Sequence, residues 1–361
     1  MIIKPSFKGK VKCILKDEQG NIKQETGYVG NKITDNFLDR LFTSVGTNWL
    51  NWESYGAGSN HRSIIGGYRT WNHRYGLGII HGCRIGNGTT PTTRDMNSLE
   101  TTLSSSPDEK NNSDRSAQGL FPAFVERQFV FYAGNGTGSV NEVGVWPGEG
   151  DMAARVILPE TIEKLETDIL EVFYKIEFDI PQRHYSGTIV NGQIDGTTDI
   201  NWDLYITDDM IYNCWIKTHL GYYGSGSGGS VYTCHNALGS LFDLFRSVED
   251  KYSVIIGDSN APSDIENDSG SGTGHLKGAE LFNGEFVFIE PDPYVEGSYQ
   301  RTGRVGFEED IANVEVAEML IFASLTDKGS PAFRITFDPA LNNQELYRLY
   351  LDFTVSLGTI S

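Results

Sequence analysis

Four short sequence patterns occur twice in this chain of 361 residues, in the same order, and this internal repeat constrains the fold more than any other feature. The first pattern is N-x-L-x-x-L-F, which stands at residues 36–42 and again, 200 residues later, at residues 236–242. Its apolar positions have the spacing of one face of a short helix. Thr34 and Asp35 in the first copy, and Thr233 in the second, are expected to cap that helix.

The other three patterns are typical of strands and turns. Residues 85–92 and 256–263 share I-G, four further residues, Pro and then Thr or Ser, which predicts a strand that ends in a turn. Residues 140–146 and 316–322 each carry one acidic residue before an apolar run. Arg155 and Arg334 each precede a closing segment, at 170–178 and 349–357, that alternates with the period of a strand.

These repeats predict an all-β chain made of two tandem related antiparallel β-sandwich domains, each with a short helix. The first domain is expected at residues 1–180 and the second at 200–361, with a linker at 181–199. Each domain is expected to open with a hairpin, whose turn lies at 17–21 in the first and at 207–210 in the second. The offset between the copies varies from 171 to 200 residues, so the copies differ by loop insertions.

One such insertion in the first domain, residues 46–75, is unusually rich in aromatic residues for a loop. It carries Trp49, Trp52, Tyr55, Tyr68, Trp71 and Tyr75 among Gly, Ser and Asn. Aromatic side chains with adaptable polar neighbours are typical of contact surfaces. Three interpretations follow: a contact loop for a neighbouring subunit, a platform for glycan rings, or a loop that folds on its own aromatic side chains.

Two acidic residues, Glu142 and Glu318, occupy equivalent positions of the repeated strand pattern. One acid per copy indicates a repeated structural role rather than a single catalytic centre. Our hypothesis is that Glu142 forms a structural ion pair with Arg155, and that Glu318 forms the same pair with Arg334.

The sequence gives little support for a metal site or an enzyme. The seven histidines show no H-x-x-x-H or H-E-x-x-H spacing, so no metal and no cofactor are expected. Asp264, Glu266 and Asp268 alternate, but they lack the Gly and the terminal Glu of an EF-hand loop, and a solvated acidic loop is the preferred interpretation. A glycosidase built from two carboxylates across a cleft is not excluded.

Charge and hydropathy restrict the partners. The chain has 48 acidic and 29 basic residues, a net charge of −19, which repels phosphate backbones and argues against direct binding of nucleic acid. No stretch approaches the roughly 20 apolar residues that span a bilayer, and the start has no signal-peptide character, so no membrane contact is expected. The four cysteines lie far apart and are interpreted as buried free thiols.

The order of these motifs resembles small structural proteins of tailed bacteriophages. The resemblance is carried by I-G-N-G at 85–88, R-x-F-x-F at 127–131, V-N-E-V-G-V-W at 140–146 and the strand that contains Arg155, and it covers residues 31–180. The second copy departs from it, because Ser259 stands where the turn has its second glycine and Leu320 replaces the glycine after the acid.

The resemblance implies a non-enzymatic structural subunit of a virion, in the tail, neck or baseplate. Such a protein would be synthesised in the bacterial host cytoplasm, contact other virion proteins and form a homo-oligomer within a symmetric assembly. The alternative is a host-surface glycan-binding module of a tail fibre or adhesin, and a polysaccharide-degrading enzyme is a third interpretation.

Overall fold

The computed structural model describes a large part of the chain, in segments. These are residues 2–35, 38, 82–106, 109–115, 121–146, 151–190, 197–211, 252–266, 268, 276–289, 295, 297–306, 314–322, 333–343 and 350–356. Their regular structure is strand, apart from the short helix α2 (Asp208–Met210) and the helical residues Asp35 and Leu38, and the strands lie in three sheets. The expectation of an all-β chain with antiparallel sheets is therefore confirmed.

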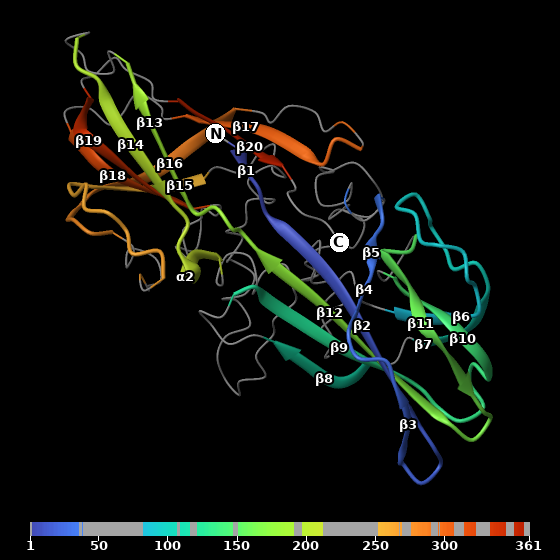
Figure 1. Cartoon of the computed structure of the whole chain (residues 1–361). Coiled ribbons are helices and arrows are strands. Elements are labelled where there is room, and N and C mark those ends of the chain that lie inside the picture. Colours follow the sequence, from blue (N-terminus) through green and yellow to red (C-terminus); the bar gives the residue numbers. More distant parts are fainter. Residues whose placement is uncertain are drawn as a thin grey trace, which may run out of the picture.

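A six-stranded sheet forms the centre of the first half (Figure 1). Its order is β3 (Ile22–Glu25), β2 (Ser6–Lys16), β12 (Ile169–Asp179), β9 (Ala123–Phe131) and β8 (Glu109–Arg115), with β4 (Val29–Gly30) also paired with β2. β2 and β12 pair over their whole length, from Lys16 opposite Ile169 to Ser6 opposite Asp179. Alternate residues of β12 are buried, as expected from the period of the sequence: Leu170, Val172, Tyr174, Ile176 and Phe178.

A five-stranded sheet packs against the inner face of this sheet. Its order is β5 (Lys32–Ile33), β11 (Ala154–Lys164), β10 (Gly138–Trp146), β6 (Gly82–Gly86) and β7 (Thr102–Ser106). Buried residues of both sheets, such as Tyr174, Cys13, Ile85 and Val143, belong to one apolar core. Cys13 and Cys83 are free thiols inside it, as expected. The two sheets thus form a β-sandwich-like body.

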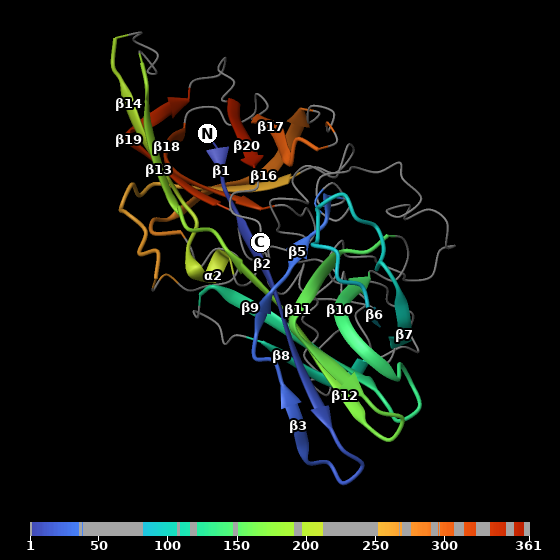
Figure 2. The ribbon, with the colours of Figure 1, turned by 45° about the vertical axis from the view of Figure 1, so that its right-hand side comes forward.

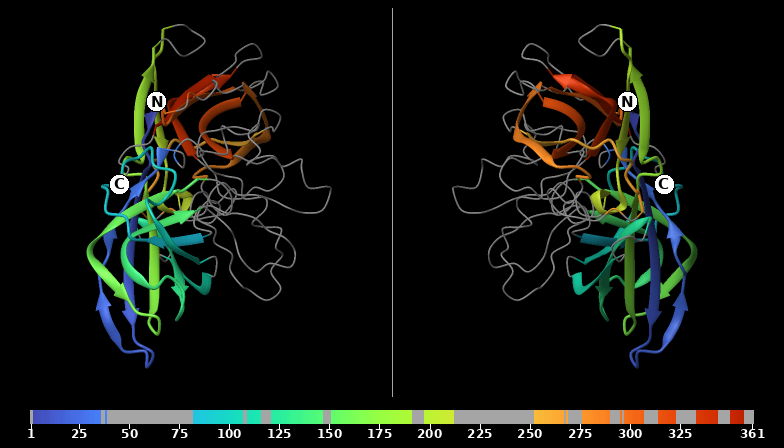
Figure 3. Two further views of the ribbon diagram at one scale, coloured as in Figure 1. Left: turned by 90° about the vertical axis from the view of Figure 1, so that its right-hand side faces the viewer. Right: turned by 90° about the vertical axis from the view of Figure 1, so that its left-hand side faces the viewer.

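The second half of the chain forms a nine-stranded sheet at the other end of the molecule (Figures 1 and 2). Its order is β1 (Ile2–Ile3), β20 (Tyr350–Ser356), β17 (Gln300–Gly306), β16 (Glu280–Ile289), β15 (Tyr252–Gly257), β18 (Val314–Phe322), β19 (Phe333–Asn343), β14 (Ile200–Tyr205) and β13 (His184–Ile189). Figure 3 shows its strands wrapping into a curved layer.

The N-terminus belongs to the sheet of the second half. β1 pairs in parallel with β20, with Ile2 opposite Thr354 and Ile3 opposite Val355, and Ile3 is fully buried. β2, which begins three residues later, belongs to the first half. The first residues therefore tie the two halves together, which the expected division at residues 180 and 200 did not include.

Two local expectations differ from the structure. The range 181–199, expected as a linker, contains β13, which pairs with β14 along its whole length. The range 207–210, expected as a hairpin turn, holds the N-cap Thr207 and the three residues of helix α2 (Asp208–Met210). The Thr207 side chain caps this helix by accepting a hydrogen bond from the Met210 backbone N–H. The hairpin turn at 17–21 is confirmed, since β2 and β3 pair on either side of it.

Other expectations fall on residues that the structure does not describe. They are the helix patterns at 36–42 and 236–242, apart from Leu38, the insertion 46–75, Thr233, Cys214 and Cys234. Among the described residues, no helix is both long and apolar enough to cross a bilayer.

Candidate functional site

Glu142 and Arg155 form a fully buried ion pair on neighbouring strands of the five-stranded sheet. Glu142 lies on β10 and Arg155 on β11, and the Arg155 Nε lies 2.7 Å from Glu142 Oε2. Neither side chain is exposed to solvent. A buried charge is costly unless it is paired and hydrogen-bonded, so the remaining partners of the two groups decide whether the pair is stable.

The backbone of the loop between β6 and β7 supplies those partners. Glu142 accepts hydrogen bonds from the backbone N–H groups of Gly88, Glu100 and Thr101, at 2.9 to 3.2 Å. Arg155 Nη1 donates to the carbonyl oxygen of Thr90 at 2.9 Å. The ion pair therefore fastens both ends of this loop to the sheet.

The two glycines of the I-G-N-G motif leave room for this arrangement. A Cβ on Gly86 would lie 2.5 Å from Glu142 Oε1 and 2.0 Å from the Thr101 carbonyl oxygen. A Cβ on Gly88 would lie 2.6 Å from the same carboxylate oxygen. The motif that carries the resemblance is thus explained by the close approach of the backbone to a buried carboxylate.

A second cluster repeats these contacts in the nine-stranded sheet. Arg334 on β19 lies 2.7 to 2.8 Å from Glu318 on β18, and neither side chain is exposed. Glu318 accepts hydrogen bonds from the backbone N–H groups of Lys277 and Gly278, and Arg334 Nη1 donates to the carbonyl oxygen of Ala261. The structure thus brings together both residue pairs that the sequence singled out.

These two clusters can hold loops in place, but they offer no surface to a substrate. Each carboxylate is enclosed and is saturated by an arginine and by backbone N–H groups. A general acid or base must reach the proton that it transfers. The geometry therefore assigns a structural role to both pairs.

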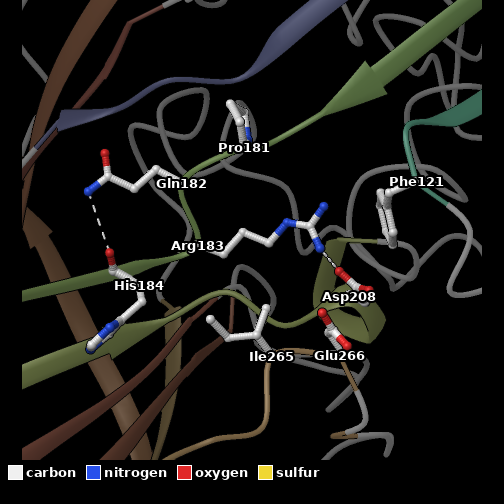
Figure 4. A pocket seen from close by; sticks show the side chains of 8 residues that line it. All are labelled: Phe121, Pro181, Gln182, Arg183, His184, Asp208, Ile265 and Glu266. Carbon is white, nitrogen blue, oxygen red and sulfur yellow. Dashed lines mark hydrogen bonds and ion pairs between the residues drawn. The ribbon is translucent and has the colours of Figure 1, made fainter.

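An open cleft of about 830 Å³ lies where the two halves of the chain meet (Figure 4). It is lined by Phe121, Pro181, Gln182, Arg183, His184, Asp208, Ile265 and Glu266. Arg183 pairs with Asp208 on α2 and, at 2.7 Å, with Asp179 at the end of β12, and its guanidinium lies 4.4 Å from the ring of Phe121. Arg183 thus connects β12 and the segment before β9 to the helix of the second half.

The chemistry of the cleft is limited by these pairings. Two carboxylates already neutralise Arg183. The ring of His184 is turned away from Arg183 in Figure 4; it stacks on Tyr205 and lies 2.6 Å from an oxygen of Asp203. Glu266 is the remaining acidic residue of the lining. We therefore interpret the cleft as a junction between the two halves of the chain.

The carboxylates of the acidic loop also have internal partners. Asp268 pairs with Lys277 and accepts a hydrogen bond from the Asp264 backbone N–H, while Asp264 accepts one from the Glu266 backbone N–H. Within the described ranges, no group of three His, Cys, Asp or Glu side chains is arranged to hold a metal ion. The described part of this loop is held by its own turn and by Lys277.

One repeated pattern was missed in the sequence. Ile33-Thr34-Asp35 recurs as Ile206-Thr207-Asp208, 173 residues later. Both segments lie at the end of a strand that pairs with the arginine-bearing strand, since the residue before each isoleucine faces the arginine: Lys32 lies opposite Arg155 and Tyr205 opposite Arg334. On this register Thr207, and not Thr233, corresponds to Thr34. The I-T-D identity was the available signal, and the N-x-L-x-x-L-F match obscured it.

The expected contact loop lies outside the described residues, together with its six aromatic residues: Trp49, Trp52, Tyr55, Tyr68, Trp71 and Tyr75.

No family model, no curated protein and no solved structure matches this chain.

Proposed function

We propose that this chain is a duplicated, non-enzymatic structural subunit of a bacteriophage virion, from the tail, neck or baseplate, which contacts neighbouring subunits through its surface. The observation that carries the proposal is the buried Glu142–Arg155 cluster. The residues behind the resemblance to phage structural proteins, Gly86, Gly88, Glu142 and Arg155, converge there. The motif is therefore a connected structural feature and not a set of unrelated short matches.

Strand order supports the duplication. The first half has the order β5-β11-β10-β6-β7, and β14-β19-β18-β15-β16 follow one another in the nine-stranded sheet. Counted within its own series of five, each strand of the first series has the same rank in chain order as its counterpart in the second.

Two irregularities in strand register also support it. The pairing of β10 with β11 shifts between Val140 and Glu142, and that of β18 with β19 shifts between Val316 and Glu318. Likewise, the pairings of β6 with β7 and of β15 with β16 both shift immediately before the glycine of the I-G motif. Bulges are retained as designed features of a fold, so bulges at matching positions favour a common origin.

The structural role is supported by where the charges lie. In both clusters the acid and base that could do chemistry are used to hold a loop against a sheet. A fold that fixes its loops in this way presents a pre-organised surface, and binding between pre-organised surfaces loses less conformational entropy. Contacts with neighbours would then be made by loops and by the outer faces of the sheets.

The proposal is tested on purified phage particles encoded by the same genome. An antibody against the chain, or a small tag fused to it, is expected to label one position on the tail, neck or baseplate in electron micrographs. Mass spectrometry of the particles is expected to find the chain in a fixed copy number. Particles that lack the chain, or hydrolysis of a capsular polysaccharide by the purified protein, would contradict the proposal.

The glycan-binding alternative rests on the aromatic composition of residues 46–75. It predicts binding on a glycan array that disappears when Trp49, Trp52 and Trp71 are replaced by Ala. A variant in which Tyr132, an exposed aromatic residue outside this loop, is replaced by Ala serves as the control. Binding that depends on the three tryptophans alone would favour this alternative.

A further inference from the structure

The two halves of the chain share one circular order of neighbouring strands. In the first half, β4 pairs with β2, and β5, which follows it, pairs with β11, so this segment joins the two sheets. In the second half, β14 makes both contacts, with β13 on one side and β19 on the other. β13 is therefore the counterpart of β2, and β20, the closing strand of the second half, is the counterpart of β12.

This circle is closed in the first half and open in the second. β2 and β12 pair along their whole length, whereas β13 and β20 do not pair among the described strands. Instead, β1 is the neighbour of β20. Figures 1 and 2 show β1 between β20 and β13, and the Tyr185 hydroxyl of β13 approaches the backbone of Lys4. β1 thus stands where the circle would close.

The free edge of β13 has hydrogen-bonding groups to offer. The carbonyl oxygen of Arg183, just before β13, accepts a hydrogen bond from the Ile206 backbone N–H at 2.8 Å. Bonded pairs alternate along an antiparallel ladder, so the backbone groups of His184, Ser186 and Thr188 point away from β14. Among the described residues, no backbone group bonds to them. This edge could therefore accept a further strand.

The first half indicates which residue of β13 corresponds to which residue of β2. Val29 of β4 lies opposite Val11 of β2. Trp202 of β14 corresponds to Val29, because each stands four residues before the isoleucine of the I-T-D motif. Trp202 lies opposite Gly187 of β13. Gly187 is therefore the counterpart of Val11.

The same comparison gives the register in which β13 would pair with β20. Val11 lies opposite Tyr174 of β12. Phe353 of β20 corresponds to Tyr174, because each stands 19 residues after the buried arginine of its half. In the closed register Gly187 would thus lie opposite Phe353.

This register conflicts with the place that β1 now occupies. It sets Ser186 opposite Thr354 and Tyr185 opposite Val355, and these are the two residues of β20 that β1 faces in the structure. The faces of the strands agree with it. Ser186 is exposed and Thr354 is half-buried, whereas Tyr185 is buried and Val355 belongs to the apolar set of β20. β1 and β13 therefore compete for the same positions on β20.

We propose that β1 is a detachable strap that holds the second half open, and that its release lets β13 pair with β20 in the register of β2 and β12. The strap is bound by two residues, of which Ile3 is fully buried and acts as its anchor. Release removes the tie that the N-terminus makes between the halves. The second half then has two discrete arrangements, which differ in the strand beside β20. The inference rests on the duplication within the proposed function and adds a conformational switch to it.

Cysteine pairs report each arrangement in the full-length chain. Directly opposite residues of neighbouring strands have Cα atoms about 4.5–5.5 Å apart, within the range of a disulfide. Residues with one strand between them lie about 10 Å apart. The pair Ser186→Cys/Thr354→Cys is therefore expected to oxidise slowly in the otherwise wild-type chain. Adding Ile3→Asp, which puts a charge at the buried anchor, is expected to speed oxidation of this pair by oxidised glutathione at least about tenfold.

Two controls are matched to this reporter. Ile2→Asp puts the same charge on the same strand, but Ile2 is 51% exposed, so oxidation of the reporter is expected to stay slow. The pair Ser186→Cys/Asp352→Cys is displaced by two residues on β20. It is expected to stay slow even with Ile3→Asp, because the closed register pairs Asp352 with Thr188.

A second reporter follows the strap itself. The pair Ile2→Cys/Thr354→Cys joins directly opposite residues of β1 and β20. It is expected to oxidise readily in the wild-type background and at least about tenfold more slowly with Ile3→Asp. Peptide mass spectrometry locates each disulfide and separates it from bonds of the four native cysteines. Circular dichroism melting curves check that each variant is folded, and Ile3→Ser replaces Ile3→Asp if that one is not.

Four results would overturn the inference. The first is a bond between positions 186 and 354 that forms no faster with Ile3→Asp than with Ile2→Asp, and the second is fast formation of that bond in the wild-type background. The third is equally fast oxidation of the displaced pair, and the fourth is a bond between positions 2 and 354 that Ile3→Asp does not slow. Any of these in a chain that is present in particles overturns this inference alone. Reporters that behave as expected in a chain absent from particles overturn the proposed function alone.

Discussion

The carboxylate of Glu142 and the guanidinium of Arg155 meet 2.7 Å apart in the interior of the first half, and neither side chain is exposed to solvent. Removing two charges from water costs several kcal/mol per ion, and only good geometry with additional hydrogen bonds offsets that cost. Here the additional bonds come from backbone N–H groups of the loop between β6 and β7. The pair therefore couples the position of this loop to the stability of the sheet.

Replacing Glu142 by Gln is expected to destabilise the protein by about 3–5 kcal/mol, because Arg155 then stays buried without a counter-charge. Urea unfolding, followed by tryptophan fluorescence and circular dichroism, measures the change in the free energy of unfolding. Glu25→Gln is the control, since Glu25 is 44% exposed and lies 3.6 Å from Lys12. That control is expected to change stability by less than about 1 kcal/mol. Equal effects of the two substitutions would refute a special role for the buried pair.

The corresponding substitution in the second half, Glu318→Gln, is expected to act locally. It removes the negative charge that neutralises Arg334. It also weakens the hydrogen bonds that the Glu318 carboxylate accepts from the backbone N–H groups of Lys277 and Gly278. Hydrogen exchange is expected to speed up at Lys277 and Gly278 and to stay at the wild-type rate at Gly88 and Thr101. Faster exchange at all four amides would mean that the two clusters do not open independently.

A side chain on Gly86, the glycine of the first I-G motif, is expected to destabilise the protein. In Gly86→Ala the new Cβ would meet the Thr101 carbonyl oxygen and the Glu142 carboxylate, both well inside contact distance. Overpacking of this kind costs about 1–3 kcal/mol, measured as a lower melting temperature. Gly30→Ala is the control, because no atom lies within 4 Å of its added Cβ, and it is expected to stay within about 0.5 kcal/mol of the wild type.

The sequence predicted the features that depend on a local pattern of residues. It did not predict those that depend on contacts between segments far apart in the chain. The alternation that begins at Leu170 predicted the buried face of β12, and the repeated acid predicted the partnership of Glu142. By contrast, no local pattern in the sequence predicts that Ile3 pairs with β20, the last described strand. The two strands are far apart in the chain, and their parallel pairing depends on the tertiary fold. The sequence predicted a turn at Thr207 because Thr and Asp are favoured both in β-turns and at the start of a helix. The ion pairs of Arg183 across the junction depend on how the halves meet.

Thr207 tests the alternative register of the repeat. Its side chain caps α2 by accepting a hydrogen bond from the Met210 backbone N–H, and Thr207 is fully buried. Thr207→Ala is expected to lower the free energy of unfolding by about 1–2 kcal/mol, whereas Thr207→Ser keeps the capping oxygen and is expected to lose much less. The pair Thr34→Ala and Thr34→Ser is expected to give the same ranking, measured by thermal unfolding. A Ser variant as damaging as the Ala variant would show that the hydroxyl is not what stabilises this position.

Asp168 is expected to contribute acid-sensitive stability at the turn between β11 and β12. Burial would raise the pKa of its carboxyl, but the hydrogen bond from Lys23, the Leu165 backbone N–H and the charges of Lys23 and Lys164 lower it below its usual range. A pKa that is lower in the folded state stabilises the fold above the unfolded value of about 3.9, and this stabilisation is lost as the pH falls through the folded value.

Asp168→Asn is therefore expected to be less stable than the wild type at neutral pH, with a difference that shrinks as the pH falls below about 4. Lys23→Met, which removes the cation 2.7 Å from Asp168, is expected to reproduce part of this behaviour. Urea unfolding at a series of pH values measures the three curves. If wild type and Asp168→Asn differ by the same amount at every pH, then titration of Asp168 is not linked to folding.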